Sequence, residues 1–136
     1  MSASPNAKEF AQLLLAYEAV SGKRIGVGTT AGFRVCEKLR GALSKLMGQG
    51  GFRSLLARAQ SLAGAEIPWL LSLEINGNGS LEGITQMQEE LNARTVAQGE
   101  AALVSHLLAL LVTFIGPALT LRLLHDIWPE MEELNH

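Results

Sequence analysis

Residues 26–31 read Gly-Val-Gly-Thr-Thr-Ala, a pattern that in some proteins cradles a phosphate. Glycines let the backbone approach phosphate oxygens, and the first N–H groups of a following helix bind the negative charge. A dinucleotide site also needs a buried strand before the loop and an acid about twenty residues after it. Here an amphipathic helix is predicted before the loop, and residues 46–51 contain no acid. We therefore interpret the segment as a connector and predict no cofactor.

The histidines and the single cysteine lack the spacing of a metal site or a catalytic centre. Neither His106 nor His125 has a second donor at i+3 or i+4, and the remaining histidine is the last residue. A metal site needs several convergent donors. Cys36 occupies an inward position of a predicted helix, where a thiol behaves as a small hydrophobe. We predict no metal site, no catalytic residue and a protein that is not an enzyme.

Charge is distributed unevenly along the chain. Eight of the eleven basic residues lie between Lys23 and Arg58 with Glu37 as the one acid, so this segment carries +7, while three basic and twelve acidic residues give the remainder −9. Such an imbalance predicts a cationic surface that faces either an external anion or the chain's own acidic part, and the sequence leaves both open. The residues that we predict to bind a partner or nucleic acid are Arg34, Lys38, Lys45, Arg53 and Arg58.

Length and composition predict one globular domain in a reducing compartment. A chain of 136 residues that is 48% hydrophobic can bury a sizeable core without metals or disulfides. Cys36 is the only cysteine, so no internal disulfide can form, and residues 1–8 lack the pattern of a secretory signal. We therefore expect a cytoplasmic protein.

Helical periodicity dominates the chain and predicts a mainly α fold. We expect a single compact domain of about five helices with one small β-hairpin, built around a long C-terminal helix. The hairpin is predicted where apolar and polar residues alternate on either side of Asn76-Gly77-Asn78-Gly79. Within the 1–136 domain the predicted elements are helices at 5–21, 31–47, 52–66, 85–92 and 96–128 and the hairpin at 70–84.

The predicted helix at 96–128 has two unlike faces. Thr95 is its expected N-cap, and Gly116-Pro117 predicts a kink because proline removes a backbone hydrogen bond. One face is bulky and apolar and should fill the core; it comprises Leu103, Leu107, Leu110, Leu111 and Phe114. The other face carries small residues, which let a second backbone approach closely. The residues that we predict to pack against another helix or a second copy are Ala102, His106, Ala109, Thr113 and Gly116.

The same helix is long enough to span a bilayer, because residues 101–121 carry no charge. However, the stretch contains Ser105, His106, two threonines and a Gly-Pro pair, and no basic cluster flanks it to set an orientation. We interpret it as a core helix and expect no membrane association.

Two functional hypotheses follow. The leading one is a non-enzymatic interaction module that forms a homodimer and presents a basic helix-turn-helix-like surface to another macromolecule, since a symmetric pair can bury the small-residue face. In the alternative, the order of helix, extended piece, helix pair and hairpin is that of a winged helix. The chain would then be a DNA-binding transcriptional regulator with the C-terminal helix as its dimer element. This is an analogy of element order alone, and Glu74 and Glu82 in the hairpin do not favour phosphate contact.

Overall fold

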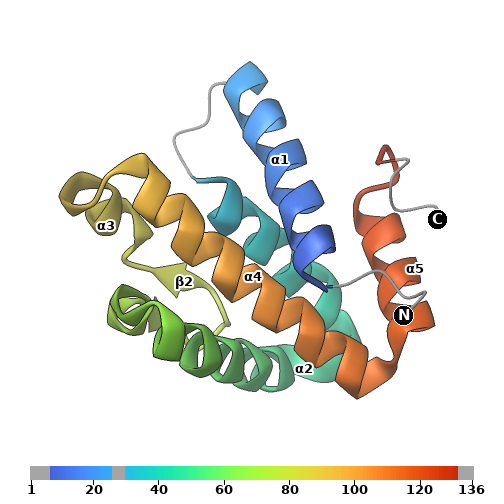
Figure 1. Ribbon diagram of the computed structural model, residues 1–136. Coiled ribbons are helices and arrows are strands. Elements are labelled where there is room, and N and C mark those ends of the chain that lie inside the picture. Colours follow the sequence, from blue (N-terminus) through green and yellow to red (C-terminus); the bar gives the residue numbers. More distant parts are fainter. Residues whose placement is uncertain (1–6, 26–29, 132–136) are drawn as a thin grey trace, which may run out of the picture.

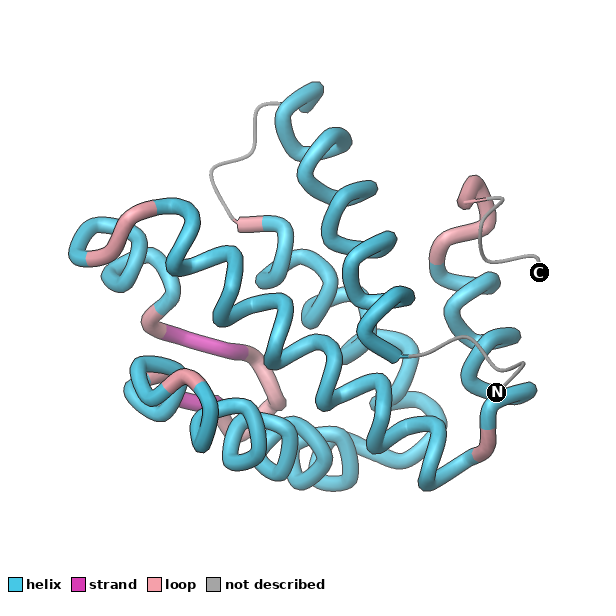
Figure 2. The backbone as a smooth tube through the Cα atoms, in the orientation of Figure 1, coloured by secondary structure: helices cyan, strands magenta, loops and turns pink. Residues whose placement is uncertain are grey.

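The computed structural model describes residues 7–25 and 30–131. As predicted, this part of the chain is mainly helical with a small two-stranded antiparallel sheet, as Figure 1 and Figure 2 show. The loop residues 26–29 and the start of the predicted helix at 5–21 lie outside these ranges. The elements in chain order are α1 (Ala7–Ile25), α2 (Ala31–Glu66), the 3₁₀ helix η1 (Pro68–Ser72), β1 (Glu74–Ile75), β2 (Leu81–Glu82), α3 (Ile84–Glu90), α4 (Ala93–Ile115) and α5 (Pro117–Ile127).

Helix α4 lies at the centre of the arrangement. It packs most extensively against α2 and α1, and Figure 1 shows it crossing the molecule with α1 on one side and the C-terminal half of α2 on the other. Leu103, Leu107 and Leu111 form its buried face, as the sequence predicts. Among the described helices α4 alone is long and apolar enough to cross a membrane, a criterion that core helices of soluble proteins also meet.

Helix α2 contains the predicted helix pair at 31–47 and 52–66. The two halves meet at Gly48, whose φ of +80° is a left-handed value that glycine adopts without a steric penalty. At the start of α2 the side chain of Thr30 caps the helix by accepting a hydrogen bond of 3.1 Å from the N–H of Phe33. Leu46, which the periodicity places inward, is instead 55% exposed just before the kink.

The predicted hairpin at 70–84 is present but shorter. Its strands comprise only two residues each and pair Glu74 with Glu82 and Ile75 with Leu81. Residues 68–72 form η1 instead of a strand because Pro68 fixes a helical φ at its first position. The tight turn at its start is closed by the N–H of Leu70, which donates to Ile67 O at 3.1 Å. The hairpin therefore reaches the helices through a compact 3₁₀ turn.

The predicted helix at 96–128 is two helices in the structure. Asn92, not Thr95, is the N-cap, because its side chain accepts a hydrogen bond of 2.8 Å from the N–H of Thr95. Gly116, with φ of +88°, ends α4, and Pro117 opens α5, where a missing N–H leaves no bond unmade. Phe114, predicted to be in the core, lies at this break and is 68% exposed.

Candidate functional site

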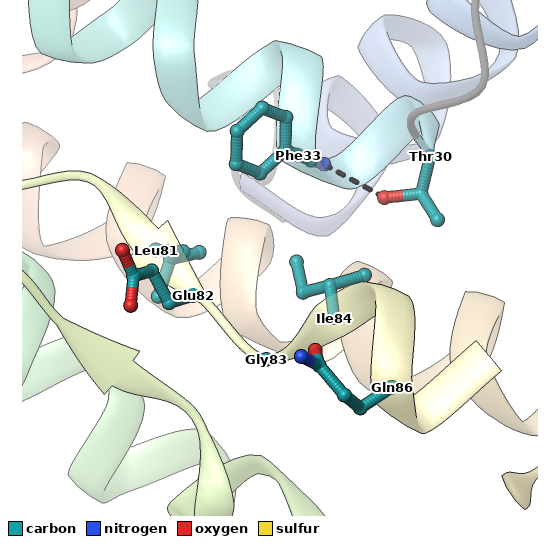
Figure 3. Close-up of a pocket in the computed structure, with 7 residues that line it drawn as sticks. All are labelled: Thr30, Phe33, Leu81, Glu82, Gly83, Ile84 and Gln86. Carbon is teal, nitrogen blue, oxygen red and sulfur yellow. Dashed lines mark hydrogen bonds between the residues drawn. The ribbon is translucent and has the colours of Figure 1, made fainter. Parts of the chain in front are cut away.

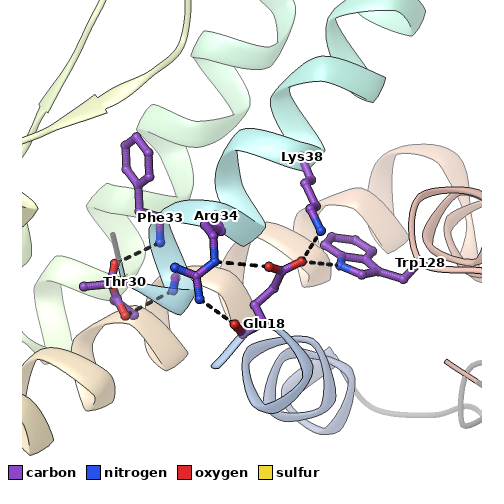
Figure 4. Close-up of polar contacts among 8 residues, drawn as sticks. Glu18, Thr30, Phe33, Arg34, Lys38 and Trp128 are labelled. Atoms are coloured by element: carbon purple, nitrogen blue, oxygen red, sulfur yellow. Dashed lines mark hydrogen bonds and ion pairs between the residues drawn. The ribbon is translucent and has the colours of Figure 1, made fainter. Parts of the chain in front are cut away.

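The carboxylate of Glu18 is the centre of a buried polar cluster, shown in Figure 4. Its side chain is 2% exposed on α1, and Arg34 Nε donates to Oε1 at 3.2 Å. Lys38 Nζ and the indole N–H of Trp128, the latter at 2.8 Å, both donate to Oε2. Lys38 also lies over the Trp128 ring, 5.9 Å from its centroid. The cluster therefore joins α1, the first turns of α2 and the residue that follows α5.

Two of the predicted partner-binding cations thus bind the chain's own carboxylate. Burial by itself would raise the pKa of Glu18, but hydrogen bonds from Lys38, Trp128 and Arg34 and the charge of Lys38 lower it below its ordinary value. A second guanidinium nitrogen of Arg34 donates to the backbone oxygen of Glu18. For Arg34 and Lys38, therefore, an acid of the chain itself supplies the opposite charge.

The other predicted cations occupy different surroundings. Lys45 is exposed and lies beside a groove between α2 and α5. Arg53 is exposed, and its Nε donates to the backbone oxygen of Asn76 at 3.1 Å, which holds the hairpin turn against α2. Arg58 is exposed on the same half of α2. The five predicted residues therefore do not converge on one site.

A second buried carboxylate, Glu100 of α4, lies at the N-terminus of α2. It is 5% exposed and accepts hydrogen bonds from the N–H of Gly32, at 3.2 Å, and from the hydroxyl of Thr30. Burial raises its pKa, and the bonds from Thr30 and Gly32 and the charge of Arg34 offset this effect only in part. An acid at this position complements the helix dipole. The position that a phosphate would take at such a helix start is thus filled by the chain itself.

A small pocket of about 260 Å³ opens beside this helix start, as shown in Figure 3. Phe33 and Thr30 of the α2 end face the hairpin and the first turn of α3 across it. The rest of the lining comprises Leu81, Glu82, Gly83, Ile84 and Gln86. The lining residues include neither lysine nor arginine.

The predicted small-residue face of α4 lies outside the core. Ala102 and His106 line a pocket of about 470 Å³ whose polar walls are Lys8, Gln12, Glu66, Gln98 and Ser105. Within it His106 Nε2 lies 3.1 Å from Glu66 Oε2. Further along, Ala109 and Thr113 are exposed, and Gly116 forms the break between α4 and α5. The face is therefore half-buried at Ala102 and His106 and exposed at Ala109 and Thr113.

A groove of about 320 Å³ lies where α2 meets the break between α4 and α5. Its apolar lining comprises Ala42, Leu46, Ile115, Leu119 and Leu123. Lys45, Arg122 and Asp126 add charges of both signs at its edge. Leu46 and Leu119 are 55% and 47% exposed, so large apolar side chains here face solvent. This groove was not predicted, because helical periodicity places Leu46 toward the core and Gly116-Pro117 was expected to produce only a kink.

Neither the cysteine nor the described metal-ligating side chains form a reactive cluster. The thiol of Cys36 is buried, which raises its pKa to about 12, so it is protonated and inaccessible. Among the described residues, no three His, Cys, Asp or Glu side chains are placed to share a metal ion. Glu18, Trp128 and Glu100 were missed by sequence reasoning, because their partners lie between 16 and 110 residues away.

Comparisons of the chain with protein-family models, curated proteins and solved structures found no significant match.

Proposed function

We propose that this protein is a non-enzymatic interaction module that assembles as a homodimer in the cytoplasm and presents basic residues of α2 to another macromolecule. In this proposal its helices, about five in number, form a single domain organised around α4. The basic residues are Lys45, Arg53 and Arg58, whose side chains are exposed, whereas Arg34 and Lys38 bind Glu18.

The observation that carries the proposal is the exposed apolar surface around the junction of α4 and α5. Phe114, Leu46 and Leu119 are 68%, 55% and 47% exposed; Leu46 and Leu119 line one groove, and Phe114 precedes the groove residue Ile115 at the end of α4. Soluble monomers rarely expose large apolar side chains together, and such groups mark interaction surfaces. An interface at this end of the molecule removes all three from water.

The neighbouring surface of α4 supports the same conclusion. Ala109 and Thr113 are exposed one to two turns before the junction, and the Thr113 hydroxyl donates to Ala109 O at 3.0 Å. A hydroxyl that bonds to its own helix presents mainly its methyl group outward. The side chains exposed before the junction are therefore small and weakly polar, which favours close packing against another helix.

The test is the molar mass in solution, measured by light scattering coupled to size exclusion over concentrations from about 1 to about 100 µM. The expected result is a mass that approaches twice 14.6 kDa as the concentration rises. A mass of one chain at every concentration overturns the homodimer.

A second candidate is the DNA-binding regulator, favoured by one observation. The kink at Gly48 divides α2 into two successive helices, and Arg53 holds the following hairpin against the second of them. The test is binding to a random duplex at low and moderate salt. Arg53→Ala and Arg58→Ala should each weaken binding and reduce the salt slope by about one, whereas Arg94→Ala should not. Absence of binding at low salt removes this candidate.

A further inference from the structure

Helix α5 has a buried face and a second face that carries both apolar and charged residues. Thr120 and Leu124 are buried against the rest of the molecule. The side that faces the groove with α2 carries a stripe at spacings of three and four residues; it comprises Leu119, Arg122, Leu123 and Asp126. Helix α5 therefore packs one side against the core and leaves part of a second apolar stripe exposed, where Leu119 is 47% exposed.

Among the described residues, the charges of this stripe also have no ion-pair partner. Neither Arg122 nor Asp126 forms an ion pair with any other described residue. Although they are four residues apart on α5, the basic residue comes first, which is the less favourable order for a pair within one helix. Both charges are therefore available to groups that approach the groove.

We propose that the occupant of this groove is a second copy of the chain, whose α5 lies antiparallel to the first. The inference rests on the homodimer proposed above and identifies its interface. Across a two-fold axis near the middle of the stripe, Arg122 comes within side-chain reach of Asp126 of the partner subunit, and the reverse contact forms at the same time. Leu123 of both copies lies at the centre, Leu119 of each copy extends the contact toward the ends, and Leu46 of α2 covers the side.

Charge complementarity favours a second copy over other occupants. A nucleic acid or an anionic membrane attracts Lys45 and Arg122 but repels Asp126, which lines the same groove. A copy of the same stripe presents an acid to the base and a base to the acid when it runs antiparallel. The pairing satisfies every charge on the stripe and buries the leucines between them.

The size of the surface predicts a weak dimer. A helix of eleven residues is about 16 Å long, so a pair of them with the flanking part of α2 gives an interface at the low end of specific contacts. We therefore expect half-dissociation in the micromolar range, with dimer and monomer exchanging during chromatography.

The experiment uses two charge reversals, Arg122→Glu and Asp126→Arg, measured by sedimentation velocity alone and mixed in equal amounts. Each variant places like charges across the axis and should dissociate at least about tenfold more readily than the wild type. The mixture places opposite charges together again, so a heterodimer of near wild-type affinity should form. Leu119→Asn, which removes exposed apolar surface without changing charge, should also weaken the dimer and not be rescued by mixing.

The controls separate this interface from dimerisation in general. Arg94→Glu and Glu90→Arg reverse exposed charges far along the chain from α5 and should leave the affinity of the dimer unchanged. A wild-type dimer that both charge reversals leave intact overturns the groove as the interface while the homodimer stands. A wild type that remains monomeric overturns both. Circular dichroism on each variant confirms that it is folded, and Leu119→Asn serves as the test if a reversal is not.

Discussion

Two buried carboxylates, Glu18 and Glu100, meet the first turns of α2 from different helices, and their surroundings differ in kind. Glu18 receives a guanidinium, an ammonium and an indole N–H. Glu100 receives one hydroxyl and one backbone N–H. Burial raises the pKa of both groups, but only the charged donors around Glu18 reverse the effect, so its pKa is lowered while that of Glu100 is raised.

The start of α2 therefore contacts two buried acids in two ways, through charged side chains at Glu18 and through a helix cap at Glu100. At Glu18 two ion pairs and the indole hydrogen bond connect α1, α2 and the residue that follows α5, and losing the charge removes both ion pairs. At Glu100 the acid acts as a cap for free N–H groups at the start of α2, where the helix dipole supplies only partial positive charge. We expect the contacts of Glu18 to contribute more to the free energy of unfolding. The contribution of Glu100 should be smaller and should change with pH.

The largest effect should come from Glu18→Gln. The amide keeps the shape of the side chain but removes the negative charge that Arg34, which is 15% exposed, and Lys38 share. Breaking one partner of a buried ion pair typically costs 3–5 kcal/mol, and we expect a loss of about 3 kcal/mol in the free energy of unfolding. Urea unfolding followed by circular dichroism at neutral pH measures it.

Glu37→Gln is the matched control for this substitution. Glu37 also binds an arginine, Arg40, at 2.6 Å, but both side chains are about a quarter exposed. Water screens such a pair, so the expected loss is at most about 1 kcal/mol. Equal losses of free energy of unfolding in the two variants would show that the buried contacts of Glu18 stabilise the fold no more than the exposed pair of Glu37 and Arg40.

A smaller effect should follow from Gly32→Ala, which tests how closely Glu100 approaches the start of α2. A Cβ at this position would lie 2.4 Å from Cδ and 2.6 Å from Cβ and Cγ of Glu100, so the acid has to move. We expect a loss of about 2 kcal/mol, as in other overpacked cores. Gly41→Ala lies on the same helix with nothing within 4 Å of the added atom, and there alanine should stabilise by about 0.5 kcal/mol. A destabilised Gly41→Ala together with a neutral Gly32→Ala would contradict the close approach.

Local patterns explain why much of the fold could be predicted. Leucines at 103, 107 and 111 are one helical turn apart and are buried, and the Asn-Gly-Asn-Gly run forms the hairpin turn between β1 and β2. Glycine and proline at 116 and 117 indicated a disturbance of the last helix, but periodicity cannot distinguish a bend from a complete break. The break depends on the φ of Gly116, which the sequence permits without requiring it.

The buried polar contacts could not be predicted in the same way. Arg34 and Lys38 were predicted to bind a partner because both are charged, and the acid that pairs with them is on another helix. Glu100 stands in an apolar helix with no donor at i±3 or i±4, so only the tertiary arrangement pairs it with Gly32. The spacing of residues along one helix gives no information about which residue of another helix they contact.

The smallest effect should come from Glu100→Gln, and its dependence on pH distinguishes it from Glu18→Gln. A carboxyl whose pKa is raised by folding binds more protons in the folded state, so its contribution to stability is present at low pH and lost as the pH rises through the folded pKa. The glutamine does not titrate. The stability of Glu100→Gln relative to the wild type should therefore increase between about pH 4 and about pH 7 and stay within about 1 kcal/mol of it.

Glu18→Gln should show the opposite trend, because the pKa of Glu18 is lowered by folding. Its contribution is present above the unfolded pKa and lost as the pH falls through the folded value, so the deficit of the variant should shrink in acid. Urea midpoints of both variants and the wild type across this pH range provide the comparison, with Glu90→Gln as an exposed carboxyl control. Parallel profiles for Glu18→Gln and Glu100→Gln would mean that the two carboxylates are held in the same way, since only unlike partners give opposite slopes.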